Sequence, residues 1–239
     1  MKVIFYDDFK VCSGNFPANW RIEKNSDMDL VATELKDGVF SLLSPGDKYL
    51  PVISPCRNAE VNFRLQIPSH VVSRYDFMIT FRYDEYHRKG ECLRIWADKN
   101  TRQQKIEYGE MIDNRFVTQQ SLDSKLPENA FSNPLPLQLS FREQKIRLQL
   151  GESAFAFETN TPPARGLIAI SRGIMFCKAG VSQFEISSDE EVNPLSEKQF
   201  RVCLPLQSVI HPFYCDCTFR DFDTFLEVEL SLDGGVRET

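Results

Sequence analysis

"LPLQLSFREQKIRLQLGESAFAFE", residues 135–158, decides the fold class of this chain. Every second residue of its first run is apolar, and these residues point to one side: Leu135, Leu137, Leu139 and Phe141. Two further runs repeat the alternation with Ile146, Leu148 and Leu150, and then with Phe155 and Phe157. A period of two is typical of a strand with one buried face. The stretch predicts three short strands joined by tight turns.

The same alternation extends on both sides of this stretch. Further strands are predicted at 38–43, 60–67, 75–83, 92–98, 103–112, 115–122, 166–173 and 175–187. Gly, Pro, Asn and Asp separate these runs at short intervals, as they do in turns. No long window shows apolar residues at helical spacing. The pattern predicts an all-β chain built as an antiparallel two-sheet sandwich.

The order of these runs also resembles a known family. "PLQLSFREQKIRLQLGESAFAFE", then "GLIAISRG" and then "VSQFEIS", resembles the last strands of concanavalin A-like (laminin-G-like, jelly-roll) domains. "YDDF" near the N-terminus and Trp20 are similar to the way such domains begin. The resemblance covers roughly residues 3–187 and implies a jelly-roll sandwich whose concave sheet commonly carries carbohydrate. Departures are Gly151–Glu152, where Asn-Gly is common, and Glu185, where Asp is frequent.

Residues 189–198 divide the chain. "SSDEEVNPLSEK" (187–198) is polar, acidic and contains a proline, which favours a linker. We expect the sandwich to occupy 1–188 and the linker 189–198. Residues 199–239 are then additional strands, either an extension of the sandwich or the start of a second domain.

Composition narrows the classes of partner. The chain has 239 residues, a net charge of −6 and 19 phenylalanines, which suit the space between two packed sheets. Without a dense Lys/Arg cluster it lacks the basic surface of a nucleic-acid binder. No run approaches the length of a membrane span, and "MKVIFYDDFK" does not resemble a signal peptide. We expect neither nucleic acid nor membrane as a partner.

The seven cysteines indicate a reducing compartment. Their number is odd and their spacing scattered, and several stand inside apolar runs such as "FRVCLPL". This favours buried free thiols over a disulfide framework. We expect a cytoplasmic protein.

One candidate ligand-binding face lies within "FMITFRYDEYHRKGECLRIWADKN" (77–100). Residues at alternate positions of a strand share a face, so Arg94, Trp96 and Asp98 lie together. If 75–83 pairs with 91–98, Thr80 and Arg82 join them. A flat indole beside guanidinium and carboxylate groups suits a sugar ring and its hydroxyls. The alternative is that Trp96 fills a core gap and that the arginines are solvated.

Catalytic signatures are weak. The catalytic signature of retaining glycosidases with this fold resembles E-x-D-x-x-E on one strand. The predicted sandwich contains no such run. The nearest pair is Glu227 and Glu229, which share a face in "FLEVELSL" and are better explained as solvated. His87 stands in a hairpin loop, where a histidine is more often solvated than catalytic. "MFCKAGVSQ" (175–183) resembles an alginate-lyase strand, but Ser182 replaces the tyrosine and no Q-[IV]-H run supplies the base.

A structural calcium ion is the one cofactor that the resemblance implies. Related domains often bind Ca²⁺ near the first and last strands through backbone carbonyls and an acidic side chain. The positions that would carry it are Asp7, Asp8, Asp37 and Glu185. Oxygen ligands suit calcium.

Three functions remain open. The first is a carbohydrate-associated, non-catalytic sandwich domain of a larger intracellular glycan-processing protein, which we expect to be bacterial. The second is a glycoside hydrolase or polysaccharide lyase on the same fold, favoured by two carboxylates about 5–9 Å apart in a cleft. The third is a structural domain that packs against a catalytic domain of the same protein, favoured by a large exposed apolar patch.

Overall fold

A computed structural model describes most of the chain. The described residues are 1–13, 16–25, 33–67, 74–98, 100–101, 103–125, 133–160, 162–173, 178–190, 198–204, 213–220 and 227–232, with side chains described up to Glu190 except for Lys125. The chain divides into two compact units, Met1–Glu191 and Val192–Thr239. The linker expected at 189–198 spans the boundary between these two ranges.

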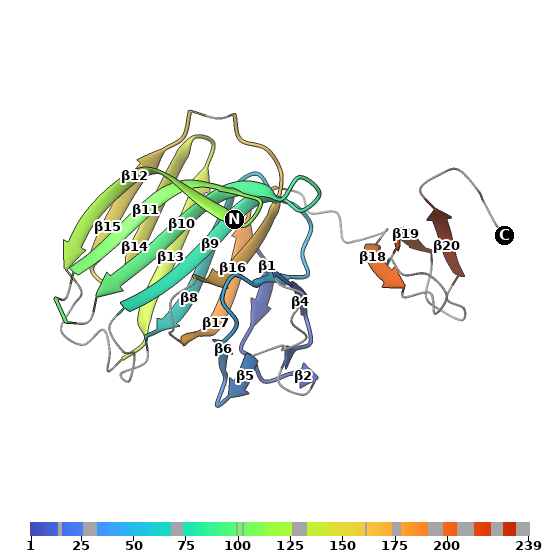
Figure 1. The fold of residues 1–239 in the computed structure, drawn as a ribbon, viewed down its shortest axis with the longest axis horizontal. Coiled ribbons are helices and arrows are strands. Elements are labelled where there is room, and N and C mark those ends of the chain that lie inside the picture. The colour runs from blue at the N-terminus through green and yellow to red at the C-terminus, as the bar shows by residue number, and fades with distance from the viewer. Residues whose placement is uncertain are drawn as a thin grey trace. The chain divides into compact units, whose positions relative to one another are not determined.

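The first unit is a sandwich of two antiparallel sheets (Figure 1). The eight-stranded sheet runs in the order β15 (Ser153–Glu158), β14 (Lys145–Leu150), β13 (Leu135–Arg142), β8 (Ala59–Gln66), β17 (Ala179–Ser188), β6 (Val39–Leu42) and β5 (Thr33–Lys36), and β1 (Lys2–Asp7) also pairs with β17. The seven-stranded sheet runs in the order β12 (Arg115–Lys125), β11 (Gln103–Ile112), β10 (Lys89–Asp98), β9 (Arg74–Asp84), β16 (Leu167–Arg172), β7 (Lys48–Pro51) and β4 (Trp20–Glu23). Two short strands, β2 (Cys12–Ser13) and β3 (Phe16–Pro17), pair with each other.

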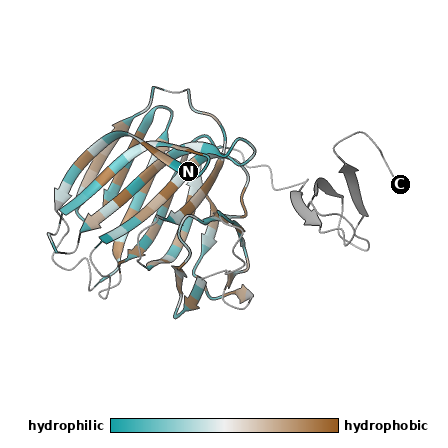
Figure 2. Cartoon of the chain, in the orientation of Figure 1, coloured by the Kyte–Doolittle hydropathy of each residue, from teal (hydrophilic) through white to brown (hydrophobic). Residues whose placement is uncertain are grey.

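The predicted strands at 135–158 are confirmed as β13, β14 and β15. All the apolar residues of their alternating runs are buried, and the two turns place Glu143 at φ 48° and Gly151 at φ 58°. Positive φ is what tight hairpin turns demand. Figure 2 shows hydrophobic and hydrophilic residues alternating along the strands of both sheets. Every regular element in the described part of the chain is a strand, which confirms the all-β sandwich.

Aromatic rings fill the space between the sheets. Phe81 of β9 stacks on Phe141 of β13 with ring centroids 4.7 Å apart, and Phe63 of β8 lies 5.7 Å from Phe77 of β9. Burying one such side chain stabilises the fold by about 1.5–3 kcal/mol. The many phenylalanines therefore join the two sheets.

The second unit contains one small sheet. β18 (Lys198–Leu204), β19 (Phe213–Arg220) and β20 (Glu227–Leu232) pair antiparallel in that order. Its strands agree with the additional strands expected after residue 198. Among the described residues of the whole chain, none forms a helix that is long and apolar enough to span a membrane.

Candidate functional site

β9 and β10 form a long hairpin that carries the predicted ligand-binding face. β9 pairs with β10 in the register that sets Asp76 opposite Trp96, which confirms the expected pairing of these two runs. The residues that alternate with Arg94, Trp96 and Asp98 on β10 are buried in the main core. Those three side chains therefore point away from the core, onto the outer face of the seven-stranded sheet.

Arg94 is held by two carboxylates. Its Nε donates to Asp76 Oδ1 at 3.0 Å and its Nη2 donates to Asp76 Oδ2 at 2.7 Å, while Nη1 lies 3.3 Å from Glu107 Oε2. The hydrogen bond to Asp76 raises the pKa of Arg94. Gly173 packs so closely here that a Cβ would come 2.0 Å from Asp76 Oδ2. Paired hydrogen bonds of this kind fix both groups.

Trp96 is half-buried beside this pair. The guanidinium of Arg74 lies over the indole, 5.9 Å from the ring centroid, and its Nε lies 3.8 Å from Asp98 Oδ2. Lys105 stands opposite Trp96 on β11. We call the group that surrounds this indole the Trp96 patch, defined as Arg74, Asp76, Arg94, Trp96 and Glu107.

Asp98 closes a turn at the end of β10. Its Oδ1 accepts hydrogen bonds from the backbone N–H of Asn100 at 2.8 Å and of Thr101 at 3.1 Å. The hydrogen bond from Thr101 is the main reason that the pKa of Asp98 is lowered. Asp98 therefore shares the predicted face but is engaged by the backbone of the turn.

Arg82 does not lie on the predicted face, so that part of the expected placement is wrong. It has φ 50°, and the register of β9 and β10 shifts between Lys89 and Glu91. This bulge turns Arg82 inward, where Nη1 donates to Glu91 Oε1 at 2.8 Å and Nη2 donates to the carbonyl of Glu143 at 2.6 Å. Its guanidinium also lies 5.4 Å from the ring centroid of Phe141. Arg82 thus joins the two sheets.

A cavity of about 240 Å³ opens beside this bulge. We call it the hairpin cavity; its walls are Arg82, Asp84, His87, Lys89, Gly90, Glu91, Glu110, Pro162 and Ala164. His87 is at the rim, with Nδ1 2.6 Å from Asp84 Oδ2 and its side chain 70% exposed. The bond to His87 lowers the pKa of Asp84. The structure therefore places this weak catalytic candidate at a cavity and gives it an orienting carboxylate.

The buried carboxylate of Glu91 lines this cavity. Its Oε1 accepts from Arg82, and its Oε2 accepts a 2.7 Å hydrogen bond from the Tyr108 hydroxyl, whose pKa is raised mainly by burial. Glu110 lies directly opposite Glu91 on β11, and its Oε2 is 3.4 Å from Lys89 Nζ. Sequence reasoning missed this group, although two glutamates on neighbouring strands were a detectable signal.

A second buried charged group lies on the outer face of the same sheet. Lys48 Nζ lies 3.2 Å from Glu23 Oε1 and 4.9 Å from the ring centroid of Tyr83, and it also bonds the side-chain oxygen of Asn114. The Tyr83 hydroxyl donates to Glu23 at 2.8 Å. Burial lowers the pKa of Lys48, whose side chain is 2% exposed. No sequence pattern pointed to this long-range contact.

Comparisons with known proteins bear on the fold. No family model matches the sequence, and no curated protein matches it. Solved structures do. The laminarinase of Flavobacterium sp. UMI-01 aligns at a TM-score of 0.56 and 8% identity over 78% of this chain and 100% of its own. The Bacillus licheniformis β-glucanase aligns at a TM-score of 0.54 and 12% identity, over 79% of this chain and 99% of its own. A Bacillus subtilis protein of galectin-like fold aligns at a TM-score of 0.55 and 11% identity, over 78% of this chain and 96% of its own.

The chain has the concanavalin A-like jelly-roll fold. At these identities the likeness extends to the arrangement of strands and no further. The expected fold is thereby confirmed.

The calcium site expected from the resemblance stays a prediction, and the structure shows where its four carboxylates lie. Asp7 Oδ1 accepts from the backbone N–H of Phe9 at 2.7 Å, and its Oδ2 accepts from the Trp20 indole at 2.9 Å. Asp8 pairs with Lys10 at 2.6 Å. The other two positions are Asp37, at φ 52° in a turn, and Glu185, opposite Tyr6 on β1. Within the described residues, no three His, Cys, Asp or Glu side chains gather as a metal site.

Glu227 and Glu229 belong to the second unit. They occupy alternate positions of β20, opposite Arg220 and Thr218 of β19. Their side chains lie outside the described residues, so the candidate pair rests on strand position alone.

Proposed function

We propose that this chain is a carbohydrate-associated, non-catalytic β-sandwich domain of a larger glycan-processing protein, and that a glycan binds the Trp96 patch. One observation carries the proposal: a half-buried indole faces outward from a sheet, with ionic groups fixed around it. The apolar C–H side of a sugar ring packs on an indole, while charged groups at its edge bind the hydroxyls.

Arg74 is the movable part of the patch. Its side chain is 53% exposed, and its guanidinium rests over the indole. A cation–π contact at an exposed site stabilises by only about 0.5–1 kcal/mol. A sugar ring can therefore displace Arg74 from the indole and leave its N–H groups at the ring edge, where they meet hydroxyls.

Arg94 is the fixed part. Both oxygens of Asp76 are occupied by its N–H groups, and Glu107 holds it from the neighbouring strand. A glycosidase needs two carboxyl groups free to act on the substrate. Because Asp76 and Glu107 are engaged by Arg94, the patch favours binding without turnover.

The thiols support an intracellular setting. Cys56 and Cys92 are free and buried, and Cys12 is free and exposed. Free thiols persist in reducing compartments. Together with the separate second unit, this supports a domain within a longer cytoplasmic protein that carries its catalytic part elsewhere.

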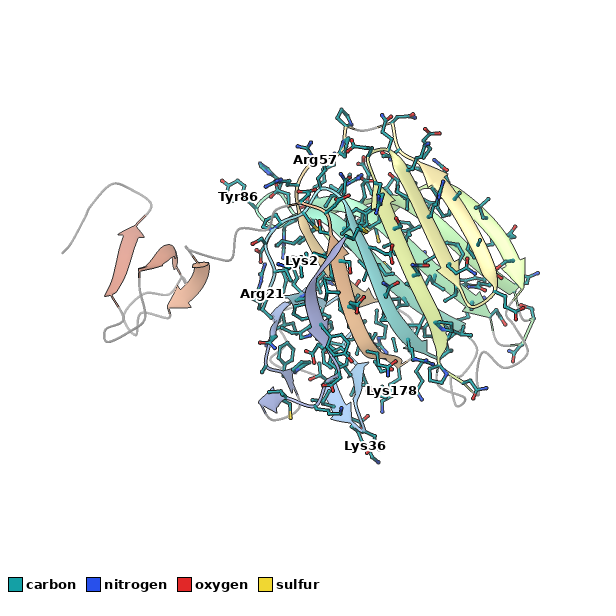
Figure 3. The ribbon with its side chains drawn as sticks, turned by 180° about the vertical axis from the view of Figure 1, so that it is seen from behind. Lys2, Arg21, Lys36, Arg57, Tyr86 and Lys178 are labelled. Atoms are coloured by element: carbon teal, nitrogen blue, oxygen red, sulfur yellow. The ribbon has the colours of Figure 1, made fainter. Side chains whose placement is uncertain are left out.

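A glycan array tests the proposal with three proteins: the intact chain, Trp96→Ala and Tyr86→Ala. Tyr86 is a matched control, because it is 73% exposed and projects from the β9–β10 turn (Figure 3), whereas Trp96 pairs with Asp76 near the other end of the hairpin. We expect the intact chain and Tyr86→Ala to bind the same glycans, and Trp96→Ala to lose about tenfold or more in affinity, as removal of a stacking ring typically costs 1–3 kcal/mol.

Two results would contradict the proposal. Binding of no glycan by the intact chain would favour the structural domain that packs against a catalytic partner. Equal binding by Trp96→Ala would place the sugar away from the patch.

A further inference from the structure

The charged groups around the hairpin cavity are paired with one another. Arg82 pairs with Glu91 at 2.8 Å and Lys89 with Glu110 at 3.4 Å, while Asp84 accepts a hydrogen bond from the His87 ring. A phosphate ligand would meet three carboxylates, and a cationic ligand would meet Arg82 and Lys89. Because these groups are already paired, the cavity favours a neutral ligand.

The rim still offers hydrogen bonds. The ammonium of Lys89 has three donors, the carboxylate of Glu110 has two acceptor oxygens, and only Nδ1 of His87 is taken. With Nδ1–H donating to Asp84, Nε2 of His87 is an acceptor. Closely set donors and acceptors of this kind match a molecule with several hydroxyl groups.

The remaining wall is apolar and the space is small. Pro162 and Ala164, from the segment between β15 and β16, line it together with Gly90. Cavities that hold drug-sized ligands run from roughly 300 to 1,000 Å³, whereas this one is about 240 Å³. A single sugar ring fits these limits better than an oligosaccharide, since it has an apolar C–H side for Pro162 and hydroxyls for the rim.

The cavity is held open by rigid surroundings. Beneath it, Glu91 is fixed by Arg82 on one oxygen and by Tyr108 on the other. Beside it, Gly90 lies so close to β9 that a Cβ would come 2.9 Å from the Tyr83 Cα. A wall that is already fixed loses little entropy when a ligand binds.

We propose that the hairpin cavity binds one neutral sugar ring or a similar small polyol, with His87 Nε2, Lys89 and Glu110 as its hydrogen-bonding partners. The inference rests on the proposed function for the class of ligand, but it uses a different site. His87 and Trp96 lie nine residues apart along one hairpin, which is on the order of 30 Å at strand spacing.

Ligand-observed NMR with a panel of free monosaccharides (glucose, galactose, mannose and xylose) tests this inference. The proteins are the intact chain, His87→Ala, Glu110→Gln and Trp96→Ala. We expect one monosaccharide or more to bind the intact chain and Trp96→Ala equally. His87→Ala and Glu110→Gln should each weaken it about tenfold, because each removes a hydrogen bond to a polar or charged group.

The folded state of each variant is checked by its unfolding curve, and His87, at an exposed position, should tolerate substitution. Monosaccharide binding that persists in both His87→Ala and Glu110→Gln overturns the inference. So does an intact chain that binds glycans on the array but no monosaccharide, and in that case the proposed function stands. Loss in Trp96→Ala alone assigns the sugar to the Trp96 patch and also overturns it.

Discussion

The outer faces of the two sheets differ although their sequences alternate in the same way. On the eight-stranded sheet, the outward residues of β13 are solvated, and hollows of about 350 and 480 Å³ lie between polar side chains such as Asn62, Gln138 and Gln149. On the seven-stranded sheet, β9 is buried from Tyr75 to Tyr83 on both faces.

The outer face of the seven-stranded sheet carries its own packed side chains. Two small apolar clusters lie on its outer face, one of Leu50, Tyr83 and Ala169 and the other of Met78, Cys92 and Met111. Thr80 joins this face, as expected, opposite Cys92. Charged groups such as Lys48 and Asp76 are buried among them. The outer face of the seven-stranded sheet is therefore packed and largely buried, whereas that of the eight-stranded sheet is an ordinary solvated surface.

Asp76→Ala should cause the largest loss of stability among the substitutions considered. The substitution leaves the partly buried Arg94 without its two hydrogen bonds to Asp76 and should lower the free energy of unfolding by about 3 kcal/mol. Glu60→Ala is the matched change on the other sheet, where Glu60 accepts from Asn62 and Gln138. It should cost about 0.5 kcal/mol or less. Urea unfolding followed by circular dichroism measures both; equal costs would remove the distinction between the two faces.

Lys48→Met should cause the second-largest loss of stability, and this loss should depend on pH. Glu23 loses its buried partner, so the free energy of unfolding should fall by about 2 kcal/mol near neutral pH. Burial lowers the pKa of Lys48 below its usual 10.5. Between these two values the unfolded chain binds more protons, so the contribution of Lys48 to stability rises with pH.

The measurement is the difference between the unfolding free energies of the intact chain and of Lys48→Met across alkaline pH. This difference should grow in favour of the intact chain as pH approaches 10.5. Lys36→Met is the control, since Lys36 projects from β5 at an exposed position (Figure 3), and it should leave the curve unchanged. A difference that does not vary with pH would mean that the Lys48 amine is solvated.

These two faces also show where sequence reasoning succeeds and where it stops. The strands at 135–158 and the pairing of β9 with β10 follow from local alternation, which reflects burial on one side. The inward turn of Arg82 depends on a bulge, and one extra residue leaves no compositional mark. Lys48 meets Asn114 across 66 residues, and Pro162 meets the β9–β10 turn across a similar span. Such contacts are set by tertiary structure, so the cavity could not be foreseen.

Thiol labelling of the folded chain should distinguish the exposed Cys12 from the buried Cys92. Cys92 lies on the outer face of the seven-stranded sheet, yet burial raises its pKa from 9.0 to about 12. That change lowers its thiolate fraction about a thousandfold at mildly alkaline pH. We expect iodoacetamide to label exposed Cys12 quickly and Cys92 only after unfolding, as peptide mass mapping reports. Rapid labelling of Cys92 in the folded chain would show that this face is open to solvent.

Gln183→Gly should give the smallest change in stability, and it should raise the free energy of unfolding instead of lowering it. Gln183 lies at φ 54° in a bulge of β17, and its side chain accepts an exposed hydrogen bond from Arg64 Nε at 2.8 Å. Glycine adopts this conformation without strain, but it loses that bond and adds freedom to the unfolded chain. Because the bond is solvated and weak, we expect a gain of about 0.5 kcal/mol in the free energy of unfolding. A loss above about 1 kcal/mol would mean that the amide of Gln183 organises the eight-stranded face, as Arg94 and Asp76 organise the other.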